Sequence, residues 1–109
     1  MRIVSGRLKG RRFSPPANFT AHPTTDYAKE SLFNIINNHF NFKDIAVLDL
    51  FSGTGSISLE FASRGCRNIQ LVESNPKHLV FIKKVILKLN IDSIKVIRQD
   101  AFRFIKSTQ

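Results

Sequence analysis

The sequence has no tryptophan, one tyrosine and one cysteine among its 109 residues. The single cysteine, Cys66, excludes an internal disulfide and any metal site built from several cysteines. We expect it to be packed between a helix and a strand. There is no apolar run of transmembrane length, and the residues after Met1 do not form the apolar core of a signal peptide. These absences predict a cytoplasmic protein with no membrane partner.

Acidic residues are also scarce, because eight aspartates and glutamates face seventeen lysines and arginines, for a net charge of +9. Such an excess of positive charge indicates a polyanionic partner, of which nucleic acid is the commonest in a cytosol. Residues 1–25 contain no acid, and we expect them to form a basic arm and loop that binds nucleic acid, with a short hairpin that bends at Gly6 and Gly10. The basic residues of this arm are Arg2, Arg7, Lys9, Arg11 and Arg12.

Two common kinds of site are missing from the sequence. There is no GxxxxGK[ST] stretch, which excludes a P-loop nucleotide site. His22, His39 and His78 do not have the spacing of metal ligands, so no metal site is expected. We expect His39 to be partly buried and His78 to lie on a helix face.

Residues 26–109 are predicted to form one α/β unit. Over the whole chain 42% of the residues are hydrophobic, which is sufficient for a core. Helices and strands are predicted to alternate, which implies parallel strands joined by right-handed crossovers. The result is half of a doubly wound nucleotide-binding sheet with strand order 3-2-1. The first helix is capped by Thr24 or Thr25, and its inward face is predicted to hold Leu32, Ile35, Ile36 and His39. The expected helices are 26–38, 56–64 and one starting after Ser74 or Asn75, and the expected strands are 45–50, 69–72 and 94–97.

The stretch VLDLFSGTGSISLEFASRG, at 47–65, runs from an apolar strand through two glycines into a helix. Gly53 and Gly55 allow a tight turn and a close approach to a ligand. Asp49, Glu73 and Asp100 stand near the ends of three consecutive strands, where doubly wound sheets bind their ligands. Glu73 is placed to accept hydrogen bonds from ribose hydroxyls. The pattern predicts a nucleoside site.

The identity of the nucleoside is suggested by Asp49. A dinucleotide site uses GxGxxG, and here the third glycine is missing. A carboxylate before the turn would repel a pyrophosphate and would attract an ammonium group. S-adenosylmethionine has an amino group, a sulfonium and no phosphate. It is therefore favoured over the alternative of an NAD-binding domain.

The chain resembles the RsmD family of 16S ribosomal RNA guanine-N2 methyltransferases, in RIVSGRLKGRRF, HPTTDYAKESLFNII, the glycine stretch, VESN and QDAF. The resemblance implies an incomplete, Rossmann-like class I methyltransferase fold, with residues 26–109 forming the N-terminal half of the cofactor domain. It implies small-subunit ribosomal RNA or the assembling 30S particle as partner, with residues 1–25 as an RNA-binding arm and loop. Its RNA-binding residues would be Arg2, Arg7, Lys9, Arg11 and Arg12. One departure is His22, where the family usually has arginine. The cofactor contacts that the resemblance implies are at Thr24, Asp49, Phe51, Gly53, Gly55, Glu73, Ser74, Asn75, Asp100 and Ala101.

The family's catalytic Asp/Asn-Pro-Pro-Tyr/Phe motif does not occur in the sequence, so no catalytic residue is assigned. The resemblance implies that this motif belongs to a fourth strand, which would lie beyond Gln109. The one Pro-Pro pair, in Ser14-Pro15-Pro16-Ala17, has no acid or amide before it and no aromatic residue after it. We expect the 109 residues alone to be inactive, and either to self-associate through the open edge of the first strand or to be only marginally stable. The alternative function is a non-catalytic, basic RNA-binding module with a nucleoside-binding fold.

Overall fold

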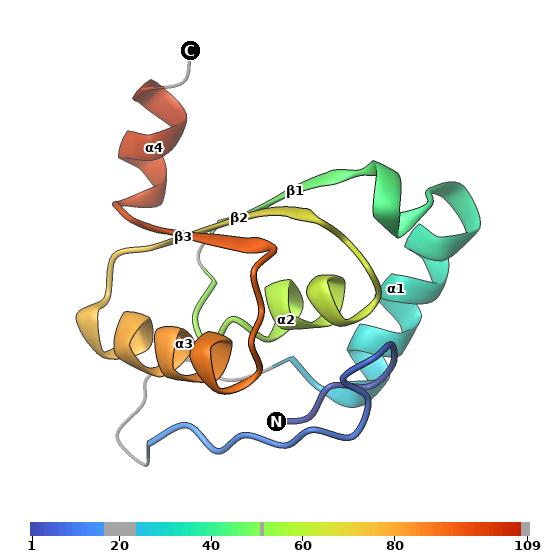
Figure 1. Ribbon diagram of the computed structural model, residues 1–109. Helices are drawn as coiled ribbons and strands as arrows, with labels where there is room; N and C mark the ends of the chain where they lie inside the picture. Colours follow the sequence, from blue (N-terminus) through green and yellow to red (C-terminus); the bar gives the residue numbers. More distant parts are fainter. Residues whose placement is uncertain (17–23, 51, 108–109) are drawn as a thin grey trace.

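The computed structural model describes residues 1–16, 24–50 and 52–107. The predicted alternation of helices and strands is confirmed (Figure 1), and each predicted boundary lies within a few residues of the observed one. The elements are α1 (Asp26–His39), a short 3-10 helix η1 (Phe42–Asp44), β1 (Ala46–Leu50), α2 (Ser56–Ser63), β2 (Asn68–Glu73), α3 (Pro76–Lys88), β3 (Ile94–Arg98) and α4 (Ala101–Ser107).

The three strands form one parallel sheet in the order β1-β2-β3, as the alternation predicts. Asp49 on β1 is in register with Leu71 on β2, and Glu73 on β2 is in register with Arg98 on β3. The central strand β2 is the most deeply buried, since Leu71 and its neighbour Val72 have no exposed surface. Within the described residues β1 is an edge strand, and its Leu48 is 48% exposed.

The elements are arranged in layers. Figure 1 shows α2 and α3 on the same face of the sheet, with the N-terminal segment running along the other side of these two helices. Helix α2 is therefore enclosed, and seven of its eight residues are buried. The α4 helix extends from the end of β3 away from the rest of the molecule (Figure 1).

The predicted N-terminal hairpin is confirmed by a bridge between Arg2 and Arg12 and by a hydrogen bond from the Ile3 N–H to the Arg11 carbonyl at 2.9 Å. Gly6, at φ +88°, lies so close to α2 that a Cβ atom there would be 2.0 Å from the Ser63 carbonyl oxygen. The arm is part of the main core and not a separate appendage, because its apolar side chains pack against α2. The buried apolar residues of the arm are Ile3, Val4, Leu8 and Phe13.

The predicted inward face of α1 is wrong in part. Leu32 and Ile35 are 41% and 60% exposed, whereas Lys29 and Phe33 are the buried residues of this helix. The reason is a cluster of aromatic rings: Phe33 packs edge-on against Phe61 of α2, with ring centroids 4.6 Å apart. A phenylalanine offers more apolar area than an isoleucine, and this contact sets the rotation of the helix.

Of the two described histidines, His78 lies on helix α3 as predicted, but His39 differs from expectation. His39 is exposed near the end of α1, although partial burial was predicted for it. His78 is buried, because the first turn of α3 lies against the end of β2, and its Nδ1 is 3.5 Å from Glu73 Oε1.

Two residues on which predictions depend lie outside the described part of the chain. One is His22, the departure from the family pattern, and the other is Gln109, the last residue of the sequence. The expectation of a fourth strand and a catalytic motif beyond Gln109 therefore stays a prediction.

Candidate functional site

The carboxyl ends of the parallel strands gather the predicted acids at one edge of the sheet. Asp49 is the second-last residue of β1, Glu73 is the last of β2, and Asp100 follows β3 by two residues. The negative charge of Glu73 is one of the influences that raise the pKa of Asp49, after burial. These two carboxylates are therefore near neighbours, as a shared ligand site requires.

Glu73 connects the glycine turn to the start of α3. Its Oε1 accepts a hydrogen bond from the Gly53 N–H at 2.8 Å, and its Oε2 accepts from the N–H groups of Ser74 and Asn75, each at 3.0 Å. The side chain is buried. Three backbone donors fix the carboxylate in one orientation, so the turn and the second strand form one rigid unit.

Asp49 has a different environment. Its Oδ2 accepts a short hydrogen bond, 2.5 Å, from the Ser58 hydroxyl, and Ser58 is fully buried in α2. Burial raises the pKa of Asp49, and the hydrogen bonds from Ser58 oppose that rise without cancelling it. A partly buried carboxylate of this kind gains stability from a cationic ligand. Ser58 was not singled out from the sequence, although its place two residues into the helix after the turn was a usable signal.

The glycine turn itself has the conformation that glycine allows. Gly53 and Gly55 have φ values of +57° and +77°. A Cβ atom on Gly55 would lie 3.1 Å from Ile82 Cγ1, so the turn packs tightly on α3. Ser52 adds a chemical signal: its hydroxyl oxygen is buried and has no hydrogen-bond partner among the described residues. A polar ligand in the turn would satisfy it. Phe51, also a predicted cofactor contact, lies outside the described residues.

The remaining predicted cofactor residues have several different environments. Thr25 caps α1 by accepting a hydrogen bond from the Ala28 N–H at 3.2 Å, so the predicted cap is Thr25 and not Thr24. Asn75 caps α3 through the Lys77 N–H. Asp100 is exposed and accepts from the Arg103 N–H at 3.1 Å, while Ala101 beside it is buried. Thr24, just before α1, is half-buried, and Ser74, just after β2, is exposed.

The predicted RNA-binding residues of the arm are mostly exposed. Arg7, Lys9, Arg11 and Arg12 all present their side chains to solvent. Arg2 is half-exposed and its Nε donates to Asp26 Oδ2 at 2.8 Å, which joins the arm to the first turn of α1. Its positive charge is thus partly compensated, and the other four carry the basic surface.

A second charged cluster, which sequence reasoning missed, fastens the arm to α2. Glu60 is completely buried and accepts hydrogen bonds from the backbone N–H groups of Val4 at 2.9 Å and Ser5 at 3.1 Å. Arg64 Nε donates to it at 2.9 Å, and Lys29 Nζ lies 3.8 Å away. The Lys29 ammonium also donates to the Arg2 carbonyl, and burial lowers its pKa.

Within the described residues, no helix is long and apolar enough to cross a membrane. Searching the same residues gives no group of three or more histidine, cysteine, aspartate or glutamate side chains arranged to hold a metal ion.

Comparison with protein families gives a match over the whole chain. The family model described as "Conserved hypothetical protein 95" matches residues 1–109. A "Ribosomal RNA small subunit methyltransferase D" from Buchnera aphidicola subsp. Baizongia pistaciae is 35% identical over 106 residues, which are 97% of this chain and 54% of that protein. The chain therefore spans about half the length of the curated relatives that it matches.

Solved structures agree on the fold. A hypothetical protein from Thermus thermophilus superimposes with a TM-score of 0.84 at 25% identity, over 99% of this chain and 60% of that one. A precorrin-6y C5,15-methyltransferase from Geobacter metallireducens has a TM-score of 0.64 at 19% identity, over 80% of this chain and 43% of that one, and at this identity it speaks for the fold alone. The three parallel strands with flanking helices are thus an incomplete class I methyltransferase fold.

Proposed function

The chain belongs to the Conserved hypothetical protein 95 family, the RsmD family, and on this premise we propose that it is the cofactor-binding and RNA-contacting part of an S-adenosylmethionine-dependent methyltransferase that acts on small-subunit ribosomal RNA. The support is a family match over all 109 residues together with relatives whose names specify this substrate class. A cytoplasmic location, on the RNA or the assembling particle, goes with this proposal.

The observation that carries the proposal is the pairing of Asp49 with a glycine turn that Glu73 holds in place. Bound S-adenosylmethionine supplies an electrophilic methyl group on a sulfonium. Its ammonium suits Asp49, whose carboxylate is desolvated and has its pKa raised by burial. The Ser52 hydroxyl, which has no hydrogen-bond partner within the described part of the chain, adds a hydrogen-bonding group in the same turn. The residues present therefore fit this cofactor.

For Glu73 the structure limits the proposed role. A carboxylate has roughly four acceptor positions, and the N–H groups of Gly53, Ser74 and Asn75 occupy three of them. We propose that Glu73 accepts one hydrogen bond from the ribose, while its main work is to position the turn. The other proposed cofactor residues are Thr24, Phe51, Gly55, Asp100 and Ala101.

The finer part of the proposal is the target, the exocyclic N2 amine of a guanine. The family's Asp/Asn-Pro-Pro-Tyr/Phe motif is absent from these 109 residues, so we propose that they transfer no methyl group by themselves. Incorporation of labelled methyl into small-subunit RNA by this chain alone would contradict that. The division into an arm at 1–25 and a cofactor unit at 26–109, and self-association through the β1 edge, also stay predictions, and light scattering on the purified chain tests the latter.

Cofactor binding is the decisive test, because the alternative function is a basic RNA-binding module without a cofactor. Isothermal titration with S-adenosylmethionine and S-adenosylhomocysteine should give binding that Asp49→Ala abolishes or weakens strongly. Asp44→Ala is the matched control, since Asp44 is an exposed aspartate just before the same strand. Binding of RNA without any binding of either cofactor would favour the alternative module. Binding of NAD in competition would favour a dinucleotide domain.

A further inference from the structure

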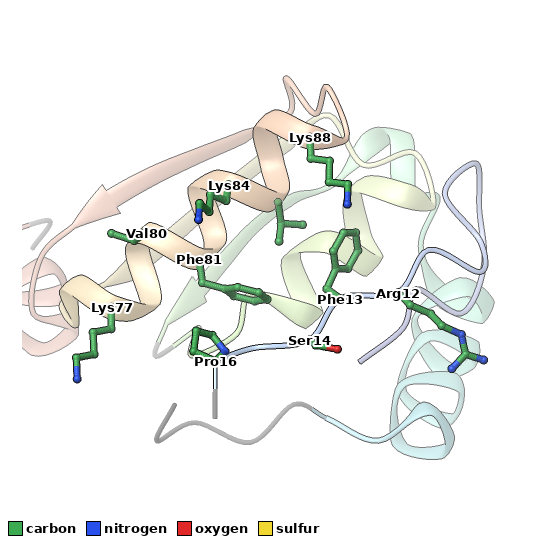
Figure 2. A pocket seen from close by; sticks show the side chains of 10 residues that line it. Arg12, Phe13, Ser14, Pro16, Lys77, Val80, Phe81, Lys84 and Lys88 are labelled. Atoms are coloured by element: carbon green, nitrogen blue, oxygen red, sulfur yellow. The ribbon is translucent and has the colours of Figure 1, made fainter. Parts of the chain in front are cut away.

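The N-terminal segment runs past α3 on the side of that helix opposite to the sheet (Figure 1). A groove lined by residues of both lies between them. Its volume is about 390 Å³, within the range of pockets that hold small molecules or single bases. Figure 2 shows the two walls: the lysines Lys77, Lys84 and Lys88 and the ring of Phe81 come from α3, and Phe13 and Arg12 come from the arm. The proposed cofactor residues are not among those that line it.

The charge of the groove is positive along its whole length. Lys77, Lys84 and Lys88 fall on one side of α3, since they are separated by seven and four residues. Over those eleven residues the helix advances by about 16 Å at ~1.5 Å per residue. Arg12 lies at the opposite end of the groove from Lys77 (Figure 2). A row of this length faces several consecutive phosphates of a nucleic-acid strand.

This charge is not neutralised from within. The thirteen residues of α3 include no aspartate or glutamate. The ion pairs of the described residues involve other cations, namely Arg2, Lys29, Arg64, Arg67 and His78. An anionic partner would therefore gain the attraction of the three lysines and Arg12 without displacing a carboxylate.

The apolar part of the lining narrows the choice of anion. Phe13 and Phe81 project into the space between the arm and α3, one from each wall (Figure 2). Aromatic side chains beside a row of cations are the usual means of holding single-stranded nucleic acid, in which the bases are unstacked and can lie against a ring. A duplex keeps its bases stacked inside and would use the lysines alone.

We infer that this groove binds a single-stranded segment of RNA, with Lys77, Lys84, Lys88 and Arg12 on phosphates and Phe81 against a base. The inference rests on the proposed RNA substrate and adds α3 to the arm as an RNA-binding element. It places the RNA path along the outer face of the helices that cover the sheet. The path thus begins at the arm and follows α3 towards its first turn, where Lys77 adjoins the Asn75 cap.

The test compares two triple variants that lose the same charge. One variant removes the three lysines of the groove, in Lys77→Ala/Lys84→Ala/Lys88→Ala. The other removes three exposed lysines outside it, in Lys83→Ala/Lys95→Ala/Lys106→Ala. Binding of a short, unstructured, labelled RNA is followed by fluorescence anisotropy over a range of salt concentrations. We expect the slope of log K against log salt to fall by about 2 in the groove variant, from ~0.7 per lost phosphate contact. The control variant should lose much less.

A separate variant tests the base contact. Phe81→Leu keeps apolar volume in the half-buried position but removes the ring. It should weaken binding of single-stranded RNA by at least about 5-fold, with the salt slope unchanged, because base stacking is independent of counterions. Unchanged affinity would overturn the base contact. A thermal melt of each variant confirms that the fold is kept.

The outcomes separate this inference from the proposed function. The assignment of single-stranded RNA to the groove would be overturned if both triple variants lost the same amount of salt slope. It would also be overturned if a duplex of the same sequence bound equally well. Equal binding of poly-L-glutamate would make the groove a site for acidic protein instead. Titration of S-adenosylmethionine into the unmodified chain is run in parallel. Failure of that titration would count against the methyltransferase proposal and leave the RNA groove standing.

Discussion

Two carboxylates lie at α2, but in opposite conditions. Glu60 belongs to the second half of the helix and receives two backbone N–H groups, the guanidinium of Arg64 and the nearby ammonium of Lys29. Asp49 of β1 contacts the first half of the helix, where its hydrogen bonds come from a single residue, Ser58, within the described part of the chain. Burial raises the pKa of Asp49, which means that its charged form lacks stabilisation.

The difference teaches how the same chemistry serves structure and binding. A buried charge that has all its partners within the protein fastens segments together, and removing one partner is expensive. A partly buried charge that is short of donors is destabilising until a ligand supplies them. The first kind fixes the arm to α2, and the second kind is the candidate cofactor contact. Mutations of Glu60 and of Asp49 should therefore change different quantities.

The largest effect is expected at Glu60. Glu60→Ala would leave the Val4 and Ser5 N–H groups buried without their acceptor and the Lys29 ammonium buried without its anionic partner. We expect the free energy of unfolding in urea to fall by about 3–5 kcal/mol. Glu30→Ala, at an exposed position on α1, is the control and should stay within about 0.5 kcal/mol. Similar small losses in both variants would show that the cluster does not fasten the arm.

The contact between the arm and α2 can be tested without changing any charge. Gly6 and Gly10 have nearly equal φ values, +88° and +86°, but a Cβ atom would overlap Ser63 only at Gly6. Gly10→Ala should cost about 1–2 kcal/mol of folding free energy from backbone strain alone. Gly6→Ala should cost that plus about 1–3 kcal/mol from overpacking. Equal losses by chemical denaturation would mean that the arm does not press on α2.

At Asp49 the expected effect is on ligand affinity and not on stability. Asp49→Asn should weaken S-adenosylmethionine binding by about 1.5–3 kcal/mol, the usual contribution of a charged hydrogen bond. Folding stability at neutral pH should not decrease. The folded-state pKa of Asp49 is raised above its unfolded value, so ionisation costs stability as pH rises from the unfolded pKa to the folded one, and the cost is complete above both.

The measurement for Asp49 is therefore a pair of curves. The free energy of unfolding of the original chain and of Asp49→Asn is measured in urea from acidic to neutral pH. As pH rises, the variant should become more stable relative to the original chain. Isothermal titration gives the affinity of each. If Asp49→Asn lost free energy of unfolding at neutral pH as well as affinity for S-adenosylmethionine, Asp49 would be a residue that holds the fold together, as Glu60 is.

The smallest effect is expected from an ion pair that involves neither Glu60 nor Asp49. Arg67 and Asp92 approach to 3.2 Å, but their side chains are 64% and 76% exposed. Their hydrogen bond and charge attraction lower the pKa of Asp92, and solvent screens most of the effect. Arg67→Ala should leave the urea midpoint within experimental error. A clear shift would show that pairing, and not burial, decides the importance of charges in this chain.

Sequence reasoning reached the parts of the fold that depend on neighbouring residues. The alternation of helices and strands, the hairpin bends at Gly6 and Gly10 and the sharp turn at Gly53 and Gly55 are all observed. Each follows from short-range signals, such as glycine conformations and the spacing of apolar residues. The inward face of α1 failed because Leu32 and Ile35 had the right spacing but Phe33 had the better partner.

By itself, then, the sequence determined the order of the elements, the parallel sheet, the basic arm and the presence of acids at the strand ends. Only the tertiary structure decided which partners each acidic side chain has. Glu60 meets Lys29 and the arm, and Glu73 meets Gly53, across long stretches of chain. The physical reason is that hydrogen bonds to a buried charge are set by how distant elements pack, and periodicity along the chain carries no information about that packing.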